Sequence, residues 1–510
     1  MRTSLLLSVA LFPLASLCQD GVLDPSFSGD GIATHGFGLA NDVARKVIQQ
    51  PDGRILVGGN TFVLGASAFG VARLLENGEL DVSFAEDGYT VHQVSSMGDA
   101  AFDMALQPDG KVLLAGVSSE VGSNGIGLMR FEADGELDMG FGTEGVSIAN
   151  IPGQSVEIYG VALQADGKIV VCGMAFSVGG QLLVARFDDT GALDLSFNST
   201  GYTLVPIGEY AVAYDVAIRP DGRIIAAGHT ETNGNASLAL AQLDTDGALD
   251  ASFGTDGIVT TELGYSWERI NGFTLDPDGA LIGVGTVGMA FDFDTFDAIA
   301  VRYLLNGTLD TSFGTNGLVI MDHSDAENGA YDAALQGDGK ILICGGADVV
   351  GQYQFALTRL LTTGMMDNTF GTGGTVLTAV GTEGSEAYSI TMQSDGRILV
   401  SGTSGDLFGA DFAVARYTSG LADGILEAAA PLDIVVFPNP ATERISVQHT
   451  STTGTVALEV IDTEGRVVLQ HSINATQRIE LDVRALADGR YVLHLIDGKA
   501  RYAGSFVKVQ

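Results

Sequence analysis

The chain is poor in basic residues, and this scarcity excludes one large class of partner. Its 510 residues include 25 Lys and Arg against 63 Asp and Glu, a formal net charge of −38 at pH 7. Proteins that bind nucleic acid need a basic surface to neutralise phosphates, so we expect no nucleic-acid partner. Nearly all of the excess acid lies between residues 19 and 420. We interpret it as a solubilising surface, with divalent-cation binding or a cationic partner as the alternative.

Long apolar runs are also scarce, and after the N-terminus no segment is long and apolar enough to be a transmembrane helix. Residues 1–18 combine Arg2 with a short apolar run and predict a signal peptide that is cleaved before Gln19. The alternative is a lipoprotein in which Cys18 carries the lipid, but Leu17 fits that pattern poorly. We therefore expect export through the Sec pathway, without a transmembrane anchor.

Cysteine is too rare for a disulfide framework, since the chain has only three. If Cys18 leaves with the signal peptide, Cys172 and Cys344 remain, far apart in the chain. Both occupy a position where corresponding segments mostly carry small residues. We therefore expect two buried packing cysteines and no disulfide.

Glycine is abundant, at 69 residues, and one unit recurs seven times between residues 23 and 417. Each copy opens with an Asp that follows Leu or Met: Asp24, Asp81, Asp138, Asp194, Asp250, Asp310 and Asp367. The Asp of an Asp-Gly turn follows 27 or 28 residues later, at Asp52, Asp109, Asp166, Asp221, Asp278, Asp338 and Asp395. Near the end of each copy an Arg stands in an apolar strand, at Arg73, Arg130, Arg186, Arg302, Arg359 and Arg416, and Gln242 takes this place in the fourth copy. Such a period indicates one supersecondary unit stacked on its neighbours.

Each copy is typical of the blade of a β-propeller. In the second copy we expect strands at 88–94, 104–107, 111–116 and 127–131, with Asp-Gly turns between apolar runs. No stretch of the repeat region keeps a helical period over ten or more residues. Four short antiparallel strands per copy favour a seven-bladed propeller within residues 19–420. A β-solenoid is the alternative.

The two ends of the repeat region favour a closed ring. A glycine stands three residues before each opening Asp, and the mature chain begins at this point of the unit with Gly21. After Arg416 no further opening Asp follows. The N-terminal segment can therefore complete the blade that Arg416 ends, which a solenoid does not require.

The recurring Arg and Asp are expected to form buried pairs, because a buried guanidinium needs a partner. The expected pairs are Arg73 with Asp81, Arg130 with Asp138, Arg186 with Asp194, Arg302 with Asp310, Arg359 with Asp367, and Arg416 with Asp24. We interpret them as scaffold rather than chemistry, because they recur in nearly every copy. Gln242 indicates that the fourth copy manages without the charge.

The repeats resemble the delta-60 repeat of bacterial surface and secreted proteins. The matching segments are Leu249–Phe253 (LDASF), Gln107–Lys111 (QPDGK) and Phe412–Tyr417 (FAVARY). The resemblance covers the repeat region in order and implies a β-propeller, without implying an activity.

A predicted linker at 421–431 leads to residues 432–510, which do not contain the repeat. Their alternating apolar runs predict a small antiparallel β-sandwich. This segment resembles the type A sorting domain of the type IX secretion system of Bacteroidota. The residues that carry the resemblance include Pro438, Asn439, Pro440, Asp462, Gly465, Gly489 and Tyr491. The resemblance implies the type IX machinery as a partner, and a secreted or outer-surface location. A generic adhesion sandwich is the alternative.

No catalytic or cofactor motif stands out, and the seven His residues lack the spacing of metal ligands. A real site in a propeller should break the symmetry of the repeat, and the fifth copy does so most. It holds the only Trp, Trp267, beside Glu268 and Arg269. It also carries Asp292, Asp294 and Asp297, a candidate site for Ca²⁺ or a glycan, although the spacing is not that of an EF-hand. An ordinary variable loop is the alternative.

Two functions remain open for the propeller. We favour a secreted or cell-surface, non-catalytic binding or adhesion protein, monomeric, with no cofactor and with a glycan or protein ligand. The alternative is an extracellular polysaccharide hydrolase or lyase. Asp, Glu, His or Tyr from one blade converging on the central pocket would favour the enzyme, and face loops of Gly, Ser, Thr and Asn would favour the binding protein.

Overall fold

The computed structural model describes residues 20–36, 41–63, 66–93, 95, 98–120, 123–177, 179–290, 292–323, 326–405, 409–420, 432–433, 435–437, 441–448, 455–461, 467–474, 478–487, 489–497 and 500–508. The chain divides into two compact units, 1–421 and 422–510. The regular elements are β-strands, and the described residues include no helix that could cross a membrane. The predicted signal peptide (1–18) and linker (421–431) lie outside the described residues.

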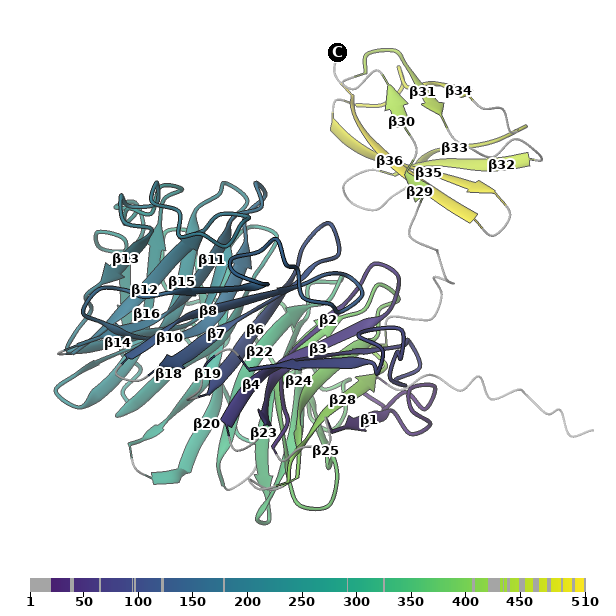
Figure 1. The fold of residues 1–510 in the computed structure, drawn as a ribbon. Coiled ribbons are helices and arrows are strands. Elements are labelled where there is room, and N and C mark those ends of the chain that lie inside the picture. The colour runs from purple at the N-terminus through teal and green to yellow at the C-terminus, as the bar shows by residue number, and fades with distance from the viewer. Residues whose placement is uncertain are drawn as a thin grey trace, which may run out of the picture. The chain divides into compact units, whose positions relative to one another are not determined.

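The first unit is a seven-bladed β-propeller, as expected from the repeat (Figure 1). Blade 1 is β2 (Val43–Gln49), β3 (Ile55–Val63), β4 (Ala66–Leu74) and β5 (Tyr89–His92); blade 2 is β6 (Asp99–Leu106), β7 (Val112–Glu120), β8 (Ser123–Phe131) and β9 (Val146–Ala149). Blade 3 is β10 (Ser155–Leu163), β11 (Ile169–Phe176), β12 (Gly180–Phe187) and β13 (Tyr202–Val205); blade 4 is β14 (Tyr210–Ile218), β15 (Ile224–Thr232), β16 (Asn235–Leu243) and β17 (Ile258–Thr261). Blade 5 is β18 (Trp267–Leu275), β19 (Leu281–Met289), β20 (Asp292–Tyr303) and β21 (Leu318–Met321); blade 6 is β22 (Asn328–Leu335), β23 (Ile341–Val349), β24 (Gln352–Leu360) and β25 (Thr375–Thr378). Blade 7 is β26 (Ser385–Met392), β27 (Ile398–Ser404), β28 (Asp411–Tyr417) and β1 (Ile32–His35).

The two ends of the repeat region pair to close the ring, which confirms the prediction. Strand β1 runs antiparallel to β28, from Ile32 opposite Ala415 to His35 opposite Phe412, and the two strands lie side by side in purple and green (Figure 1). The backbone amide of Gly21 donates to Thr418 O at 2.8 Å. Every blade thus takes its outermost strand from the next copy of the repeat, so no blade edge is left without this fourth strand.

The blades pack on each other through apolar side chains. The Phe that follows each opening Asp is at most 1% exposed: Phe27, Phe84, Phe141, Phe197, Phe253, Phe313 and Phe370. Cys172 and Cys344 are buried and form no disulfide. Both contribute to inter-blade cores, as packing residues do.

In six places the recurring Arg contacts the opening Asp of the following copy. The Nε–Oδ2 distances are 2.7 Å for Arg73–Asp81, Arg130–Asp138 and Arg302–Asp310, 2.8 Å for Arg186–Asp194, and 2.9 Å for Arg359–Asp367 and Arg416–Asp24. Each guanidinium also donates to a backbone carbonyl of the next blade and lies over the recurring Phe. For Arg73 these contacts are Ala133 O at 2.7 Å and the Phe84 ring, whose centroid is 4.7 Å from Cζ. One cation thereby ties two blades together.

Hydrogen bonds hold these carboxylates in the ionised form. Burial raises the pKa of Asp138, but hydrogen bonds from Lys111, Gly140 and Arg130 outweigh this and lower it to about 2. The pairs therefore stay charged at neutral pH, which stabilises the folded ring.

We predicted that the fourth copy lacks the buried guanidinium that the other copies place near the opening Asp. This prediction is wrong, because Arg219 supplies a guanidinium from another position. Arg219 stands where the second copy has Gln107, and Gln242 stands where the other copies have Arg. Arg219 Nε donates to Gln242 Oε1 at 2.7 Å, and Gln242 Nε2 donates to Asp250 Oδ2 at 2.7 Å. The other blades show the reverse pair, for example Arg359 Nη1 donating to Gln336 Oε1 at 3.4 Å. The two side chains have exchanged places and keep the contact.

The second unit contains two sheets. One has the order β29 (Leu432–Asp433), β36 (Ala500–Lys508), β35 (Gly489–Asp497), β32 (Thr455–Ile461), β33 (Val467–Asn474), and the other β30 (Val435–Phe437), β31 (Arg444–Gln448), β34 (Arg478–Asp482). Val447 of the smaller sheet and Leu493 of the larger belong to one apolar core.

Of the residues predicted to mark the sorting domain, Gly489 begins β35 and pairs with Lys508. Tyr491 is 7% exposed, and its hydroxyl donates to Ala487 O at 2.9 Å. Pro438, Asn439, Pro440, Asp462 and Gly465 lie outside the described residues.

Candidate functional site

Each of the seven innermost strands carries a β-bulge at the same place. In blade 1 the pairing of β2 with β3 shifts between Ala44 and Lys46, so Arg45 is the extra residue. The same shift occurs in β6, β10, β14, β18, β22 and β26. A bulge changes the direction in which the side chains around it point. The side chains at and next to the seven bulges form two layers about the propeller axis.

Glycine on the second strand makes each bulge possible. In blade 2, Gly116 lies opposite Ala101, and a Cβ at Gly116 would lie 1.9 Å from Ala100 O. A glycine occupies this position in all seven blades: Gly59, Gly116, Gly173, Gly228, Gly285, Gly345 and Gly402. Any side chain would push the innermost strand away, so the repeat itself dictates the geometry of the site.

The first layer is formed by the seven extra residues of the bulges, which we call the collar: Arg45, Phe102, Tyr159, Tyr214, Asn271, Tyr331 and Tyr388. All seven are partly exposed. Five of them are aromatic, although nothing in the scaffold of the repeat requires an aromatic residue there.

Neighbouring collar side chains contact each other around most of the ring. The ring centroids are 5.1 Å apart for Phe102 and Tyr159, 5.0 Å for Tyr159 and Tyr214, and 5.3 Å for Tyr331 and Tyr388. The Arg45 guanidinium lies over Tyr388 and Phe102, with Cζ 4.5 and 5.5 Å from the ring centroids. The collar is therefore an aromatic surface with one cation set into it.

Two glutamates orient the collar phenols. Glu386 accepts hydrogen bonds from Tyr331 at 2.5 Å and from Tyr388 at 2.7 Å, and Glu157 accepts one from Tyr159 at 2.5 Å. Burial and the adjacent glutamates raise the pKa of each of these phenols above the usual value. The phenols therefore stay protonated at neutral pH and act as donors rather than as bases.

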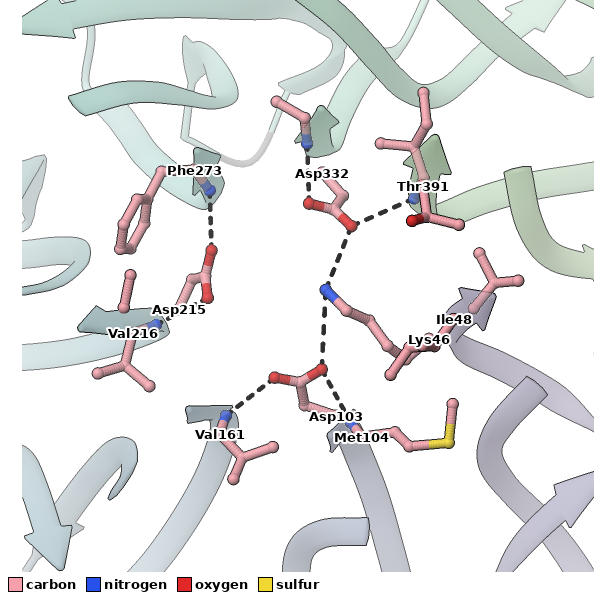
Figure 2. A pocket seen from close by; sticks show the side chains of 14 residues that line it. Lys46, Ile48, Asp103, Met104, Val161, Asp215, Val216, Phe273, Asp332 and Thr391 are labelled. Carbon is pink, nitrogen blue, oxygen red and sulfur yellow. Dashed lines mark hydrogen bonds and ion pairs between the residues drawn. The ribbon is translucent and has the colours of Figure 1, made fainter. Parts of the chain in front are cut away.

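The second layer lies one residue further along the strands and contains Lys46, Asp103, Asp215 and Asp332, which we call the charged ring. It lines a cavity of about 290 Å³, to which all seven innermost strands contribute. Figure 2 shows Lys46 reaching between two of the carboxylates. Its Nζ lies 3.4 Å from Asp332 Oδ2 and 3.8 Å from Asp103 Oδ1.

Each aspartate of the charged ring also binds the backbone of the next blade. The donors are Val161 N to Asp103 at 2.9 Å, Phe273 N to Asp215 at 2.9 Å, and Ile390 N to Asp332 at 3.2 Å. The blades between them carry small residues at this position, namely Gly160, Gly272 and Ser389. A Cβ at Gly272 would lie 2.3 Å from Tyr331 O, so the small residue lets adjacent innermost strands approach.

Asp215 is the carboxylate of the charged ring that lies apart from Lys46 (Figure 2). Its oxygens accept from Val216 N at 2.7 Å and from Phe273 N at 2.9 Å. Burial, with a smaller contribution from Asp103 and Asp332, raises the pKa of Asp215 to about 7 despite the attraction of Lys46. Burial lowers the pKa of Lys46, but the three carboxylates outweigh this and raise it. Lys46 is thus a permanent cation facing one carboxyl group that titrates near neutral pH.

Beside the collar, between blades 4 and 5, His229 lies among aromatic rings. It is 2% exposed, and its ring centroid is 5.7 Å from that of Tyr214, 5.5 Å from Trp267 and 5.9 Å from Tyr210. Its nitrogens form no hydrogen bond to a described residue, and Glu231 Oε1 lies 3.5 Å from Nε2. Burial, helped by Arg269, lowers the pKa of His229 to about 4, so the imidazole is neutral at pH 7.

The three residues of the fifth copy that break the symmetry have different surroundings. Glu268 is 1% exposed and accepts from Leu263 N and Tyr265 N at 2.8 Å each, so it holds the loop before β18. Trp267 contacts His229. Arg269 Cζ lies 5.9 Å from the centroid of the Tyr214 ring.

A polar groove opens where these loops meet blade 4. It has a volume of about 670 Å³, and hydroxyl and amide side chains dominate its lining, with Thr230, Asn235 and Ser237 among them. Tyr265 and Glu262 also line it. The Thr, Asn and Ser residues are types that we expected of a binding face, whereas Tyr265 and Glu262 are not.

Asp292 and Asp297, from the acidic loop of the fifth copy, lie on strand β20. Asp297 lies opposite Val287 and Asp292 opposite Met289 in β19, and the side chain of Asp294 lies outside those that the structure describes. Among the described residues no group of three His, Cys, Asp or Glu is placed to hold a metal ion. A Ca²⁺ site with Asp292, Asp294 and Asp297 stays a prediction.

Sequence reasoning missed the collar and the charged ring, although both stand at fixed offsets. Each collar residue lies five positions before the residue that opens the Asp-Gly turn, as Tyr159 does before Gln164 and Tyr388 before Gln393. An aromatic residue five positions before the turn, followed by Asp or a small residue, recurs in several copies and could have indicated these two layers.

Comparison with known families agrees with both units. A domain of unknown function (DUF5122) that forms a β-propeller matches residues 50–84, 107–141, 164–197, 219–253 and 336–370. A secretion-system C-terminal sorting domain matches residues 435–509. The chain joins DUF5122 propeller repeats to a secretion sorting domain. The sorting domain indicates export to the extracellular space or the outer cell surface and implies the type IX secretion machinery as a partner, as the sequence predicted.

The chain is also similar, at low identity, to several solved structures. A polysaccharide lyase of family PL25, an ulvan lyase bound to -[GlcA(1-4)Rha3S]-, is 11% identical with a TM-score of 0.43, over 78% of this chain and 94% of that one. Polysaccharide lyase Uly1 is 10% identical with a TM-score of 0.42, over 79% and 98%. Sqt1 of Chaetomium thermophilum is 10% identical with a TM-score of 0.38, over 80% and 99%. At these scores the likeness carries no argument about activity, and no curated protein matches the chain.

Proposed function

We propose that the DUF5122 propeller is an exported, non-catalytic binding protein that holds a saccharide against the collar. The observation that carries the proposal is the aromatic surface of Phe102, Tyr159, Tyr214, Tyr331 and Tyr388, partly exposed at one register position of five innermost strands. The scaffold of the repeat needs no aromatic residue there, because Arg45 and Asn271 fill the same position in the other two blades.

The chemistry of the collar suits a sugar ring. Aromatic faces offer apolar contact area, and protonated phenols offer hydrogen bonds from the same side chain. Glu157 and Glu386 add oriented acceptors. The polar groove of blade 4 supplies further hydroxyl and amide groups for an extended chain of sugars.

The phenols favour binding over catalysis. A lyase or hydrolase needs a group that takes up a proton near neutral pH, and the raised pKa values keep Tyr331 and Tyr388 protonated, so neither phenol is that group. Asp215 has a pKa of about 7, but its oxygens already accept from the backbone amides of Val216 and Phe273. Glu386 is already engaged by both phenols. These contacts describe a rigid, oriented surface.

One observation favours a second candidate, a polysaccharide hydrolase or lyase. His229 is a neutral imidazole without a hydrogen-bond partner among the described residues, 5.7 Å from the Tyr214 ring between centroids. A neutral imidazole can accept a proton as a general base, although a pKa of about 4 makes His229 a weak one at neutral pH.

A glycan array probed with the full mature chain, followed by calorimetric titration of the best ligand, tests the proposal. We expect Tyr159→Ala and Tyr214→Ala each to weaken binding about tenfold, since loss of one stacked ring costs about 1.4 kcal/mol. Tyr202→Ala is the control, because Tyr202 lies on the outer strand β13, away from the collar.

Three outcomes decide between the readings. Binding without turnover that the collar variants reduce and Tyr202→Ala does not would support the proposal. Equal binding by wild type and both collar variants, or no saccharide bound at all, would overturn it. New reducing ends or unsaturated products that disappear in His229→Gln would establish the second candidate instead.

A further inference from the structure

Three basic side chains in the described part of the propeller lack an ion pair, and two of them, Arg45 and Arg269, lie in the collar region. The described propeller contains 16 Lys and Arg. All but Arg45, Arg219 and Arg269 have a carboxylate oxygen within 4.0 Å. Arg219 is bonded to Gln242, which leaves Arg45 and Arg269. In a chain with 63 acidic residues, two cations without an ion pair beside one aromatic surface call for an explanation.

Both arginines have donor capacity to spare. The Nε of Arg45 and the Nε of Arg269 are buried and make no hydrogen bond to a described residue. The recurring Arg of the scaffold lies over a Phe ring in the same manner as Arg45 lies over Tyr388, but it also has its Asp. Contact with an aromatic ring therefore does not explain why Arg45 lacks a carboxylate.

His229 adds a third unused polar group beside Arg269. It is 2% exposed, and neither nitrogen is hydrogen-bonded to a described residue. A buried polar group without a partner costs free energy, and native structures retain one where a ligand or water completes it. Its neighbour Glu231 Oε1 lies at 3.5 Å from Nε2, beyond the range of a good hydrogen bond.

The acidic surface does not rule out an anionic ligand at this place. At physiological ionic strength charges more than about 8 Å apart are largely screened in solvent, whereas a partly buried guanidinium binds a carboxylate strongly and in a fixed geometry. The two glutamates that contact collar residues, Glu157 and Glu386, accept hydrogen bonds from Tyr hydroxyls, and two of the three aspartates of the charged ring lie within 4.0 Å of Lys46.

We infer that the collar selects saccharides that carry anionic groups, carboxylates or sulfate esters, and that Arg269 and Arg45 each bind one such group. The inference rests on the proposed function and deepens it. His229 contributes a hydrogen bond on the Arg269 side. The sugar ring of an acidic saccharide would stack on the aromatic side chains, and its anionic groups would form ion pairs with the two guanidiniums.

Calorimetric titration of the full mature chain with matched ligands tests the inference. The first pair is a galacturonate tetramer and its methyl ester, and the second is a sulfated galactan tetramer and its desulfated form. We expect one charged ligand to bind at least tenfold more tightly than its neutral partner. Arg269→Gln and Arg45→Gln should each lower the ratio between the affinities for the charged and the neutral ligand, and remove most of the preference for charge. Arg223→Gln is the matched control, since Arg223 is bonded to Asp250 and Asp221 in the scaffold.

The outcomes separate this inference from the proposed function. Equal affinity for charged and neutral ligands, with binding still lost in Tyr159→Ala, would overturn the inference and leave the proposed function standing. A charge preference that survives both arginine variants would also overturn it. Binding of no saccharide at all would overturn both. Galacturonate and sulfated galactan distinguish a carboxylate site from a sulfate site.

Discussion

The exchanged pair of blade 4 allows a double-mutant cycle on the scaffold. Arg219→Gln removes a guanidinium that is 3% exposed and donates to Gln242 Oε1 and Gly279 O. Hydrogen bonds to a charged group contribute about 1.5–3 kcal/mol each, partly offset because the burial that lowers the pKa of Arg219 is relieved. We expect a loss of about 3 kcal/mol in the free energy of unfolding.

The second single variant should be as damaging for the opposite reason. Gln242→Arg places a second guanidinium beside Arg219, and at roughly 4 Å two like charges repel by about 4 kcal/mol in an effective dielectric of about 20. The double variant Arg219→Gln with Gln242→Arg recreates the Gln–Arg arrangement of the other blades. We expect it to be within about 1 kcal/mol of wild type, so the coupling energy should exceed about 4 kcal/mol.

Equilibrium unfolding in guanidinium chloride, followed by tryptophan fluorescence, measures this cycle. Trp267 is the only Trp of the chain and lies in blade 5, next to the altered blade, so the signal reports on the propeller alone. A double variant as unstable as the sum of the two single variants would refute the exchange, and would show that Arg219 acts independently of Gln242.

Three further predictions concern the charged ring and the closure of the propeller. Lys46→Met should destabilise the protein by about 2–4 kcal/mol at pH 8, because it leaves Asp103 and Asp332 buried without a cation. The loss in the free energy of unfolding should be smaller at pH 5. Denaturant unfolding that shows the same loss at pH 5 and pH 8 would contradict this prediction. Asp215 has a folded pKa of about 7, above its unfolded value of 3.8, so the stability that its proton contributes is full below the unfolded value and is lost progressively as the pH rises to and through 7. Asp215→Asn should therefore flatten the fall in melting temperature between pH 5 and pH 8, and an unchanged slope would show that other groups cause it. Deletion of residues 20–35 removes β1 and leaves β28 as an open edge; we expect soluble aggregates by light scattering, and a stable monomer would show that the ring does not depend on this closure.

The seven-bladed architecture could be predicted from the sequence because the same pattern of strands and turns recurs seven times. An Asp-Gly turn such as Asp109-Gly110 can be recognised from adjacent residues alone, and seven such turns mark seven blades. The position of Gly21 and Arg416 within the repeat then predicts that the two ends close the ring. The Arg–Asp contacts also followed, since Arg73 and Asp81 are only eight residues apart.

The collar and the charged ring could not be predicted without the register of the strands. Tyr159 and Tyr214 meet at the axis only because a bulge in each strand turns them there, and no local pattern marks a bulge in advance. The ion pair of Lys46 with Asp332 joins residues 286 apart in the chain, which only the closed ring brings together. The exchange of Arg219 and Gln242 depends in the same way on a contact between two strands rather than on either position alone.

The hydrogen bond from Gly21 N to Thr418 O has a consequence for the evolution and engineering of this domain. Because the first and last described residues of the propeller, Asp20 and Gly420, lie at the same blade, a short peptide can join them and the chain can be reopened at any of the other inter-blade loops. Circular permutation would keep every strand pair, every bulge and the order of the collar residues. The point at which the chain leaves the ring could thereby be moved around the circumference while the collar stays as it is.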